Sequence, residues 1–345
     1  MRFLLRGPAV AVIGVLVVLS ATGLARHSAV APAAPAAAET TARIVKAAGA
    51  VLASLDDAGR AKVQFPFEGP QKTRWSNLPT GIYERQGLRM GDLTPAQRAS
   101  VMTLLEAALS RDGYRKVTEI VRADETLKTG GPGGRVTFGE AEYYLAFLGT
   151  PSTATPWMLQ FGGHHLAINL TLAGSQASMA PSLPATQPAK YQFEGREIRP
   201  LGRENDKSFA FINALDAGQR SQAILGSAVA DLVLGPGQDG KVIQPEGIRA
   251  SALTPAQQTM LLDLVREWTG IMPDAFAEPR MAEIRANLPQ TWFAWSGPTT
   301  NGSAAYFRIQ GPTLVIEYAP QRSVDHIHTI YRDPTNDYGA KLVAK

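Results

Sequence analysis

The spacing of apolar and polar residues predicts helices followed by strands in both halves of the chain. In residues 93–110 and 253–270, apolar side chains recur at helical spacing along one face. Both runs begin with Leu-Thr-Pro-Ala-Gln, in which the threonine can cap a helix and the proline can occupy its first position. Aromatic-rich runs bounded by glycine or proline follow at 142–149 and 291–297, and they favour strands.

Two later stretches read as strand, glycine turn and strand, and so predict antiparallel β-hairpins. They are residues 155–174 and 303–320. In the first, Gly162–Gly163 suits the tight turn of the hairpin. Each half is therefore expected to combine a helical layer with an antiparallel sheet, which is an α+β arrangement.

The two halves also match each other along the sequence, which indicates an internal duplication. Leu93 and Leu253 begin the same pentapeptide 160 positions apart, and residues 52–65 match 212–225 at the same offset. Two further pairs of segments match at an offset of 148, namely 143–151 with 291–299 and 157–169 with 305–317. The predicted fold is a pseudo-twofold tandem of two α+β units, each made of helices followed by antiparallel β-hairpins.

The beginning of the chain predicts export. Arg2 and Arg6 precede an uncharged apolar run at 9–25, the pattern of a secretory signal. The run is short for a membrane span, which takes about 20 residues. We expect a periplasmic or secreted protein without a stable membrane span after signal cleavage. The alternative is a protein anchored by an uncleaved N-terminal helix.

These patterns together predict five consecutive segments. Alanine and proline dominate the residues after the apolar run, and Pro181, Pro184 and Pro188 are expected to keep the join between the units irregular. The predicted segments are a signal peptide (1–25), a disordered Ala/Pro linker (26–43), a first α+β unit (44–180), a linker (181–200) and a second α+β unit with a C-terminal histidine-containing extension (201–345).

Composition excludes several kinds of site. The chain of 345 residues has no cysteine, which rules out disulfides, thiolate catalysis and Cys-ligated zinc or iron–sulfur centres. Its 34 Lys and Arg exceed its 30 Asp and Glu, but Arg2, Arg6 and Arg26 lie in or beside the leader. The mature chain is therefore nearly neutral and gives no reason to expect nucleic-acid binding.

Four of the five histidines form two close pairs, His164–His165 and His326–His328. In an extended His-Ile-His, both imidazoles face the same way, about 6.5–7 Å apart along the strand, and can converge on one metal ion. If His164 and His165 lie in a strand, they face opposite sides, so only one of them is expected to join that pair. The second unit has Pro312 and Thr313 at the positions that match His164 and His165.

The candidate metal ligands are therefore His164, His165, His326 and His328. Neutral imidazoles suit zinc, copper, nickel or iron, and the identity stays open. A carboxylate is a further candidate ligand, from Asp325, Asp333, Asp337 or Glu204. The competing interpretation is that each pair lies on the surface or makes ordinary buried hydrogen bonds.

Two hypotheses on function follow. The first is an exported metal-dependent hydrolase or oxidase that acts on a small molecule at the histidine site. The second is a non-catalytic periplasmic accessory protein that binds a metal or another ligand. The sequence names no substrate, no protein partner and no catalytic residue.

Several long segments resemble a bacterial family named as domain of unknown function 3500. They include "RWSNLPTGIYERQGLRMGDLTPAQ", "PWMLQFGGHHLAIN", "LGRENDKSFAFINALD" and "DHIHTIYRDPTNDYG". The resemblance covers roughly residues 45–339. It includes the four histidines but implies no activity, substrate or role for them.

Overall fold

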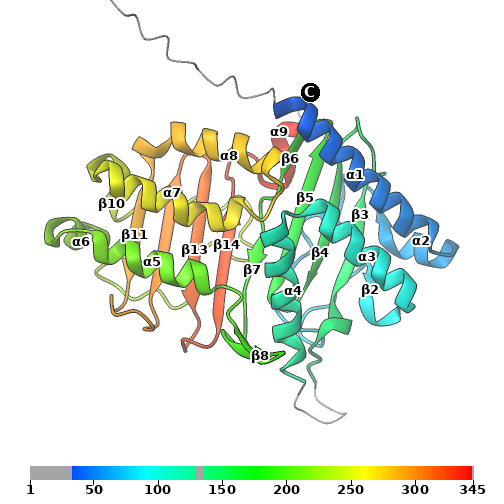
Figure 1. Cartoon of the computed structure of the whole chain (residues 1–345), viewed down its shortest axis with the longest axis horizontal. Helices are drawn as coiled ribbons and strands as arrows, with labels where there is room; N and C mark the ends of the chain where they lie inside the picture. The colour runs from blue at the N-terminus through cyan, green and yellow to red at the C-terminus, as the bar shows by residue number, and fades with distance from the viewer. Residues whose placement is uncertain (1–32, 129–134, 344–345) are drawn as a thin grey trace, which may run out of the picture. The chain divides into compact units, whose positions relative to one another are not determined.

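The computed structural model describes residues 33–128 and 135–343. The predicted signal peptide lies outside these residues. None of the described helices is both long and apolar enough to cross a membrane. The described chain mixes helices with mainly antiparallel sheets, which confirms the α+β class (Figure 1).

In the first half, helices lie across one face of a sheet of short and long strands (Figure 1). The helices are α1 (Ala33–Ala53), α2 (Asp57–Val63), α3 (Pro95–Ala108) and α4 (Arg111–Glu125). The strands are β1 (Gln64–Phe65), β2 (Leu88–Arg89), β3 (Tyr144–Leu148), β4 (Trp157–Gly163), β5 (Leu166–Ala173), β6 (Gln176–Ser178) and β7 (Leu183–Pro184). All neighbouring pairs are antiparallel except β1 with β3.

The second half repeats this order of elements. Its helices are α5 (Gly202–Ala214), α6 (Ala217–Ala223), α7 (Pro255–Thr269), α8 (Asp274–Ala286) and the terminal α9 (Ala340–Val343). Its antiparallel sheet contains β10 (Ile248–Arg249), β11 (Trp292–Ser296), β12 (Tyr306–Gly311), β13 (Leu314–Pro320) and β14 (Ile327–Arg332). Short 3₁₀ helices are η1 (Pro70–Thr73), η2 (Met90–Asp92), η3 (Glu140–Glu142), η4 (Ala250–Ala252), η5 (Leu288–Gln290) and η6 (Asp337–Gly339).

The predicted helix starts are confirmed at α3 and α7. Thr94 and Thr254 are the N-caps, and each accepts a hydrogen bond from the backbone N–H of a glutamine three residues later. The side chain of each glutamine accepts a hydrogen bond from the backbone N–H of the cap residue, which completes a capping box. A proline fills the first position of both helices, where a missing N–H costs nothing.

The strand registers of the two halves correspond at the offsets found in the sequence. Leu88 lies opposite Leu145 where β2 pairs with β3, and Ile248 lies opposite Phe293 where β10 pairs with β11. Both central hairpins also have two-residue turns, at 164–165 and 312–313. These correspondences are the ones that the tandem arrangement requires. The pseudo-twofold relation itself stays a prediction.

The segment that contains β7 joins the two sheets edge to edge. It pairs with β5 on one side, and on the other Ser182 and Thr186 bond to Tyr331 and Ile327 of β14 (Figure 1). The prediction of an irregular linker at 181–200 is therefore wrong for its first part. The proline-rich segment can form these ladders because its bonds use the N–H groups of non-proline residues, Ser182, Ala185 and Thr186.

The rest of this segment reverses direction at Gly195. Residues 191–198 form a small hairpin of β8 (Tyr191–Phe193) and β9 (Arg196–Ile198). Glu194 and Gly195 at its turn have φ angles of 49° and 74°. Positive φ at both positions is what a two-residue turn with the right-handed twist of the strands requires.

The prediction of a disordered Ala/Pro linker at 26–43 is wrong from residue 33 onward, where α1 begins. Alanine is the strongest helix former, and α1 packs on α3 with Ala37, Ile44 and Ala48 buried. The earlier residues of the predicted linker lie outside the described part of the chain. Alanine-rich composition alone could not distinguish a flexible tether from a packed helix.

Apolar side chains fill both faces of the joined sheets. Between the helices and the sheets, the fully buried residues include Phe147 and Trp157 in one half and Trp268 and Trp295 in the other. Burying a large apolar side chain contributes about 1.5–3 kcal/mol. On the opposite face, a smaller cluster brings Trp75 and Leu232 against the sheet. The loops that carry these two residues also carry polar groups of the candidate site.

Candidate metal centre

The histidines of the first pair form the turn between β4 and β5. The predicted Gly162–Gly163 turn is wrong, because both glycines belong to β4 and the two turn residues are His164 and His165. His165 has a φ of 62°, in the left-handed region that few non-glycine residues adopt. Its backbone N–H donates to the Asn77 carbonyl (3.3 Å), and its carbonyl accepts from Ala185 of the β7 segment (2.8 Å). The turn therefore sits directly beside the join between the two sheets.

A partly buried arginine ties this turn to the neighbouring loop. Arg85 Nη2 donates to the carbonyl oxygens of Gly163 (2.8 Å), Ser76 (2.8 Å) and Leu78 (2.6 Å). One guanidinium group thus binds the end of β4 and both residues that flank Asn77. Burial has the largest effect on the pKa of Arg85 and lowers it, although nearby tyrosines and Asp124 favour the charged form.

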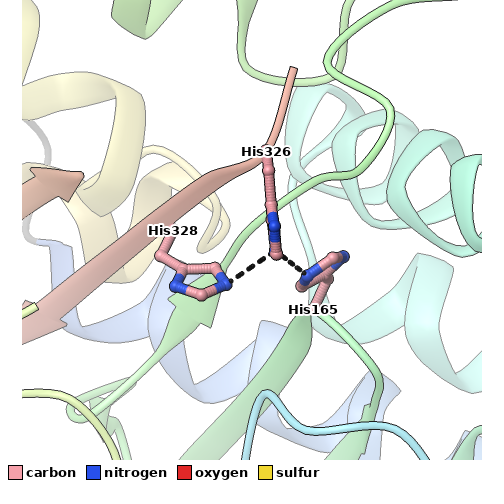
Figure 2. Close-up of side chains that lie close together, drawn as sticks. All are labelled: His165, His326 and His328. Carbon is pink, nitrogen blue, oxygen red and sulfur yellow. Dashed lines mark hydrogen bonds between the residues drawn. The ribbon is translucent and has the colours of Figure 1, made fainter. Parts of the chain in front are cut away.

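The histidines of the second pair lie at the beginning of β14. His328 is inside the strand and buried, while His326 immediately precedes the strand and is partly exposed. Both rings point toward the turn that carries His165 (Figure 2). The segment containing β7 bonds to both His165 and β14, so it determines how far apart these rings lie.

Three imidazoles from the two halves meet at one point. The Nε2 atom of His326 lies 2.9 Å from Nε2 of His165 and 3.1 Å from Nε2 of His328 (Figure 2). A donor nitrogen of each ring lies within 4.8 Å of those of the other two. His165 is only 1% exposed and His328 only 3% exposed. The structure thus brings together three of the four predicted residues and identifies His165 as the member of its pair that joins them.

His164 has a different partner. Its Nδ1 lies 2.5 Å from Oδ1 of the buried Asp124 of α4, whose Oδ2 accepts the backbone N–H of Gly139 (2.8 Å). The rings of His164 and His165 are stacked with their centroids 3.6 Å apart. Imidazole lone pairs lie in the plane of the ring, so two stacked rings are poorly placed to bind the same ion. His164 therefore packs against the three-histidine cluster without completing it.

Asp231 and Asn77 orient His328 from opposite sides. Oδ1 of Asp231 lies 2.9 Å from Nδ1 of His328, and Nδ2 of Asn77 lies 3.2 Å from Nε2 of the same ring. A carboxylate accepts and an amide nitrogen donates, so Nδ1 carries the proton and Nε2 offers its lone pair. Such a carboxylate–histidine pair is the usual support of a metal-binding imidazole. Gln321 donates to the other oxygen of Asp231 (2.6 Å) and holds the carboxylate in place.

The two contacts that His326 Nε2 makes with the other Nε2 atoms cannot both be straight hydrogen bonds. Nε2 of His328 presents a lone pair, and Nε2 of His326 faces both neighbours with at most one proton in the neutral ring. That proton can point toward only one of the two neighbouring Nε2 atoms. At the other contact, two lone pairs face each other or the hydrogen bond is bent. Nδ1 of His165 is also buried and has no hydrogen-bond partner among the described residues. A cation at the centre would attract the lone pairs of all three rings at once.

The local electrostatics favour the neutral rings of His165 and His326. Burial, followed by the neighbouring imidazoles His164, His328 and His326, lowers the pKa of His165 well below its usual range. Burial and then His328 lower the pKa of His326 to about 4. Burial is the largest single influence on Asp231 and acts to raise its pKa. The bond to His328, the proximity of that ring and the hydrogen bonds from Leu232 and Gln321 together outweigh burial and lower the pKa. Neutral imidazole is the form that binds metal ions.

The cluster opens into a cavity of about 530 Å³. Ligand pockets commonly have volumes of about 300–1,000 Å³, so a small organic molecule could fit. All four predicted histidines contribute to its lining, together with Asn77 and Asp231. The remaining wall comes mainly from the loop around residues 73–83.

The carboxylates that contact the histidines are not the ones proposed from the sequence. Glu204 binds Lys116, Asp333 binds Arg280 and Asp337 binds Arg332, while Asp325 accepts a backbone N–H from Ala189. Asp124 and Asp231, which do contact the rings, lie 40 and 97 residues from their histidine partners. Neither has a local pattern that sets it apart, since one is inside a helix and the other in a long loop.

Comparison with known proteins gives a family but no activity. Neither the search of curated proteins nor the search of solved structures found a match. A family model described as "Protein of unknown function (DUF3500)" matches residues 37–340, which is most of the chain and includes all four candidate histidines. The chain therefore belongs to the DUF3500 family, as its sequence segments had indicated.

Proposed function

We propose that His165, His326 and His328 hold one divalent transition-metal ion and that the protein is a metal-dependent hydrolase. The observation that carries this proposal is the convergence of three Nε2 atoms, with separations of 2.9 and 3.1 Å about His326. In a tetrahedral site with Zn–N distances of 2.0–2.1 Å, ligand nitrogens lie roughly 3.3 Å apart. Only small side-chain shifts would bring the three rings to that spacing.

The set of donors favours zinc among the candidate metals. Three neutral imidazoles suit zinc, copper, nickel and iron, and hydrolysis at zinc needs no redox partner. A site with three protein ligands keeps a fourth position open, where zinc can lower the pKa of a bound water to about 7. Copper or iron found in the purified protein would direct attention to the oxidase hypothesis instead.

The location of the cluster favours an enzyme over the alternative, a non-catalytic accessory protein that carries metal. His165 and His328 are almost fully buried, and the ligands come from both halves of the protein. A site that passes metal to a partner needs ligands which that partner can reach. Here the approach to the ion runs through a cavity large enough for a small substrate.

The surrounding side chains have distinct roles in this proposal. Asp231 holds the proton on Nδ1 of His328 and thereby keeps Nε2 available. Asn77, 3.2 Å from that Nε2, is close enough to donate to a substrate oxygen at the open position. Asp124 holds His164 through Nδ1, while the His164 side chain contributes to the cavity wall.

Metal analysis of adjacent variants tests the proposal. The protein purified without a histidine tag is expected to contain about one equivalent of metal per chain. His165→Asn should lower the metal content below about a tenth of an equivalent, because one of three ligands is lost. His164→Asn is the matched control and should keep its metal, since that ring binds Asp124 instead. Equal losses in both variants, or no metal in the parent protein, would refute the assignment.

We propose further that the two α+β units are a pseudo-twofold tandem. Equal registers at β2–β3 and β10–β11, and equal two-residue turns, support this. In such a tandem, the site would lie where the two copies join. Pro312 and Thr313 would occupy the turn that corresponds to His164 and His165.

Export also belongs to the proposal, and it rests on the sequence of residues 1–25 alone. Fractionation of the native host is expected to recover the chain outside the cytoplasm. Mass spectrometry of that chain should show a mature protein shorter by about 25–40 residues, as cleavage of a signal peptide predicts. A full-length chain in the cytosolic fraction would contradict export, and a full-length chain in the membrane fraction would indicate the N-terminal anchor.

A further inference from the structure

The wall of the metal cavity is aromatic, apolar or neutral over most of its surface. Its aromatic and apolar members are Trp75, Leu78, Pro79, Tyr83 and Pro236. Neutral hydrogen-bonding groups come from Thr73, Ser76, Asn77 and Gln321. Among the described residues that line it, none is a lysine or an arginine.

The charges near the cavity work against an anionic substrate. Asp231 is the one carboxylate among the described residues of the lining, and its side chain is 39% exposed. Arg85 lies behind the wall, and its Nη2 is occupied by the carbonyls of Ser76, Leu78 and Gly163. Sites that act on phosphoryl groups surround the anionic oxygens with arginine, lysine or metal ions. A single ion could bind one oxygen of a phosphate, but the wall offers no cation for the others.

We infer that the substrate is an uncharged acyl compound, an ester or an amide, whose apolar part lies against Trp75 and Tyr83. This inference rests on the proposed hydrolase function and specifies its substrate class. The oxygen of one water forms a bond to the acyl carbon, and the bond from that carbon to the alcohol oxygen or amine nitrogen breaks. One proton of the water goes to the leaving group, and the other stays with the carboxylic acid or is released to solvent.

The test compares two esters that differ mainly in charge. The probes are 4-nitrophenyl hexanoate, which is neutral, and mono-4-nitrophenyl glutarate, which carries a distal carboxylate. Each rate is corrected for hydrolysis in buffer and divided by the zinc content of the sample. The zinc-loaded protein is expected to show a kcat/KM at least about tenfold higher for the neutral ester. The zinc is used at the reacting ester group, Asp231 repels the distal carboxylate, and no lysine or arginine of the described lining binds it.

Two lysine variants locate the effect in the cavity. Leu78→Lys places a cation in the lining, at a side chain that is 43% exposed, and should reduce the preference for the neutral ester by about tenfold. Ile82→Lys is the matched control. It adds the same charge at a side chain that is 61% exposed and outside the lining, and should change the preference by less than about twofold.

The outcomes separate this inference from the metal proposal. A zinc-loaded protein that hydrolyses the anionic ester as well as the neutral one, or hydrolyses neither, would overturn the substrate class while leaving the metal site in place. A protein that binds no zinc would overturn the proposed function and this inference with it. An equal effect of both lysine variants would assign the preference to overall charge and contradict a cavity that selects neutral substrates.

Discussion

Replacing His326 and His328 with alanine is expected to abolish metal binding and with it the stabilisation of the protein by metal. A ligand that binds only the folded state stabilises it by about 4 kcal/mol when its free concentration is 1,000 times Kd. Added zinc should therefore raise the Tm of the metal-depleted parent protein and leave that of the double variant unchanged. Differential scanning calorimetry at several zinc concentrations measures both. A zinc-dependent rise in Tm that survives the double substitution would place the metal elsewhere.

A second variant separates loss of metal from loss of fold. His328 is buried in β14, and its removal leaves Asp231 without its partner. His326→Gln together with His328→Gln keeps polar side chains of similar length in both places. It should retain the circular dichroism spectrum of the parent protein and still bind no zinc. Asp231→Asn should have a smaller effect than the double substitution, because it leaves all three imidazoles in place. It should weaken zinc binding by only about 10–100-fold.

Replacing Lys116 with methionine is expected to have the largest effect on stability. Lys116 of α4 contacts the carboxylate of Glu204 in α5 and the carbonyl oxygen of Glu267 in α7 (2.8 Å), so it joins the two halves. Its side chain is 9% exposed and that of Glu204 is fully buried. Removing one partner of a buried ion pair typically costs about 3–5 kcal/mol, because the other charge stays buried. Urea denaturation should show this decrease in the free energy of unfolding.

The pH dependence of this variant identifies the cause. Burial raises the pKa of Glu204, so this carboxyl holds a proton more tightly in the folded state than in the unfolded state. The stability that it contributes is therefore lost as the pH rises through its folded-state pKa. Without Lys116, the destabilisation should be larger at pH 8 than at pH 5. A loss that does not depend on pH would indicate lost packing of the lysine stem instead.

An exposed lysine provides the control. Lys128 pairs with Glu125 at the surface, where the two side chains are 43% and 40% exposed. Exposed pairs contribute about 0–1 kcal/mol, so Lys128→Met should change the free energy of unfolding by no more than that. Similar losses in the two lysine variants would contradict the importance assigned to the buried contact. The double variant Lys116→Met with Glu204→Leu should recover part of the loss, because no unpaired carboxylate remains at that position.

Local sequence patterns predicted the elements whose causes are local. Thr94-Pro95 and Thr254-Pro255 start helices because capping and the missing proline N–H act within one turn. Aromatic-rich runs and strand–turn–strand patterns predicted β3, β4 and β5 and their counterparts, since strands buried on both faces consist largely of apolar residues. The sequence also singled out all four histidines at the cavity, because the residue type is rare elsewhere in the chain.

Predictions failed where a segment's conformation depends on distant partners. Residues 33–43 belong to a helix, α1, that packs on α3 and α8. The proline-rich segment around β7 is extended because β5 and β14 supply its hydrogen bonds. The turn lies at His164–His165 and not at the predicted Gly162–Gly163, because Gly163 and Leu166 are the last paired residues of β4 and β5. Such pairings join residues that are far apart in the sequence, or depend on hydrogen bonds along the whole length of two strands. Composition reveals neither.

The sequence by itself determined which side chains could form the site, namely two pairs of imidazoles with no thiol available as a competing ligand. Only the tertiary structure decided that His165, and not His164, meets His326 and His328. The physical reason is that imidazole ligation depends on directions and distances of a few ångström. These are determined by β7 between the sheets, by Asp124 on His164 and by Asp231 on His328. None of those three contacts leaves a signature in the residues next to the histidines.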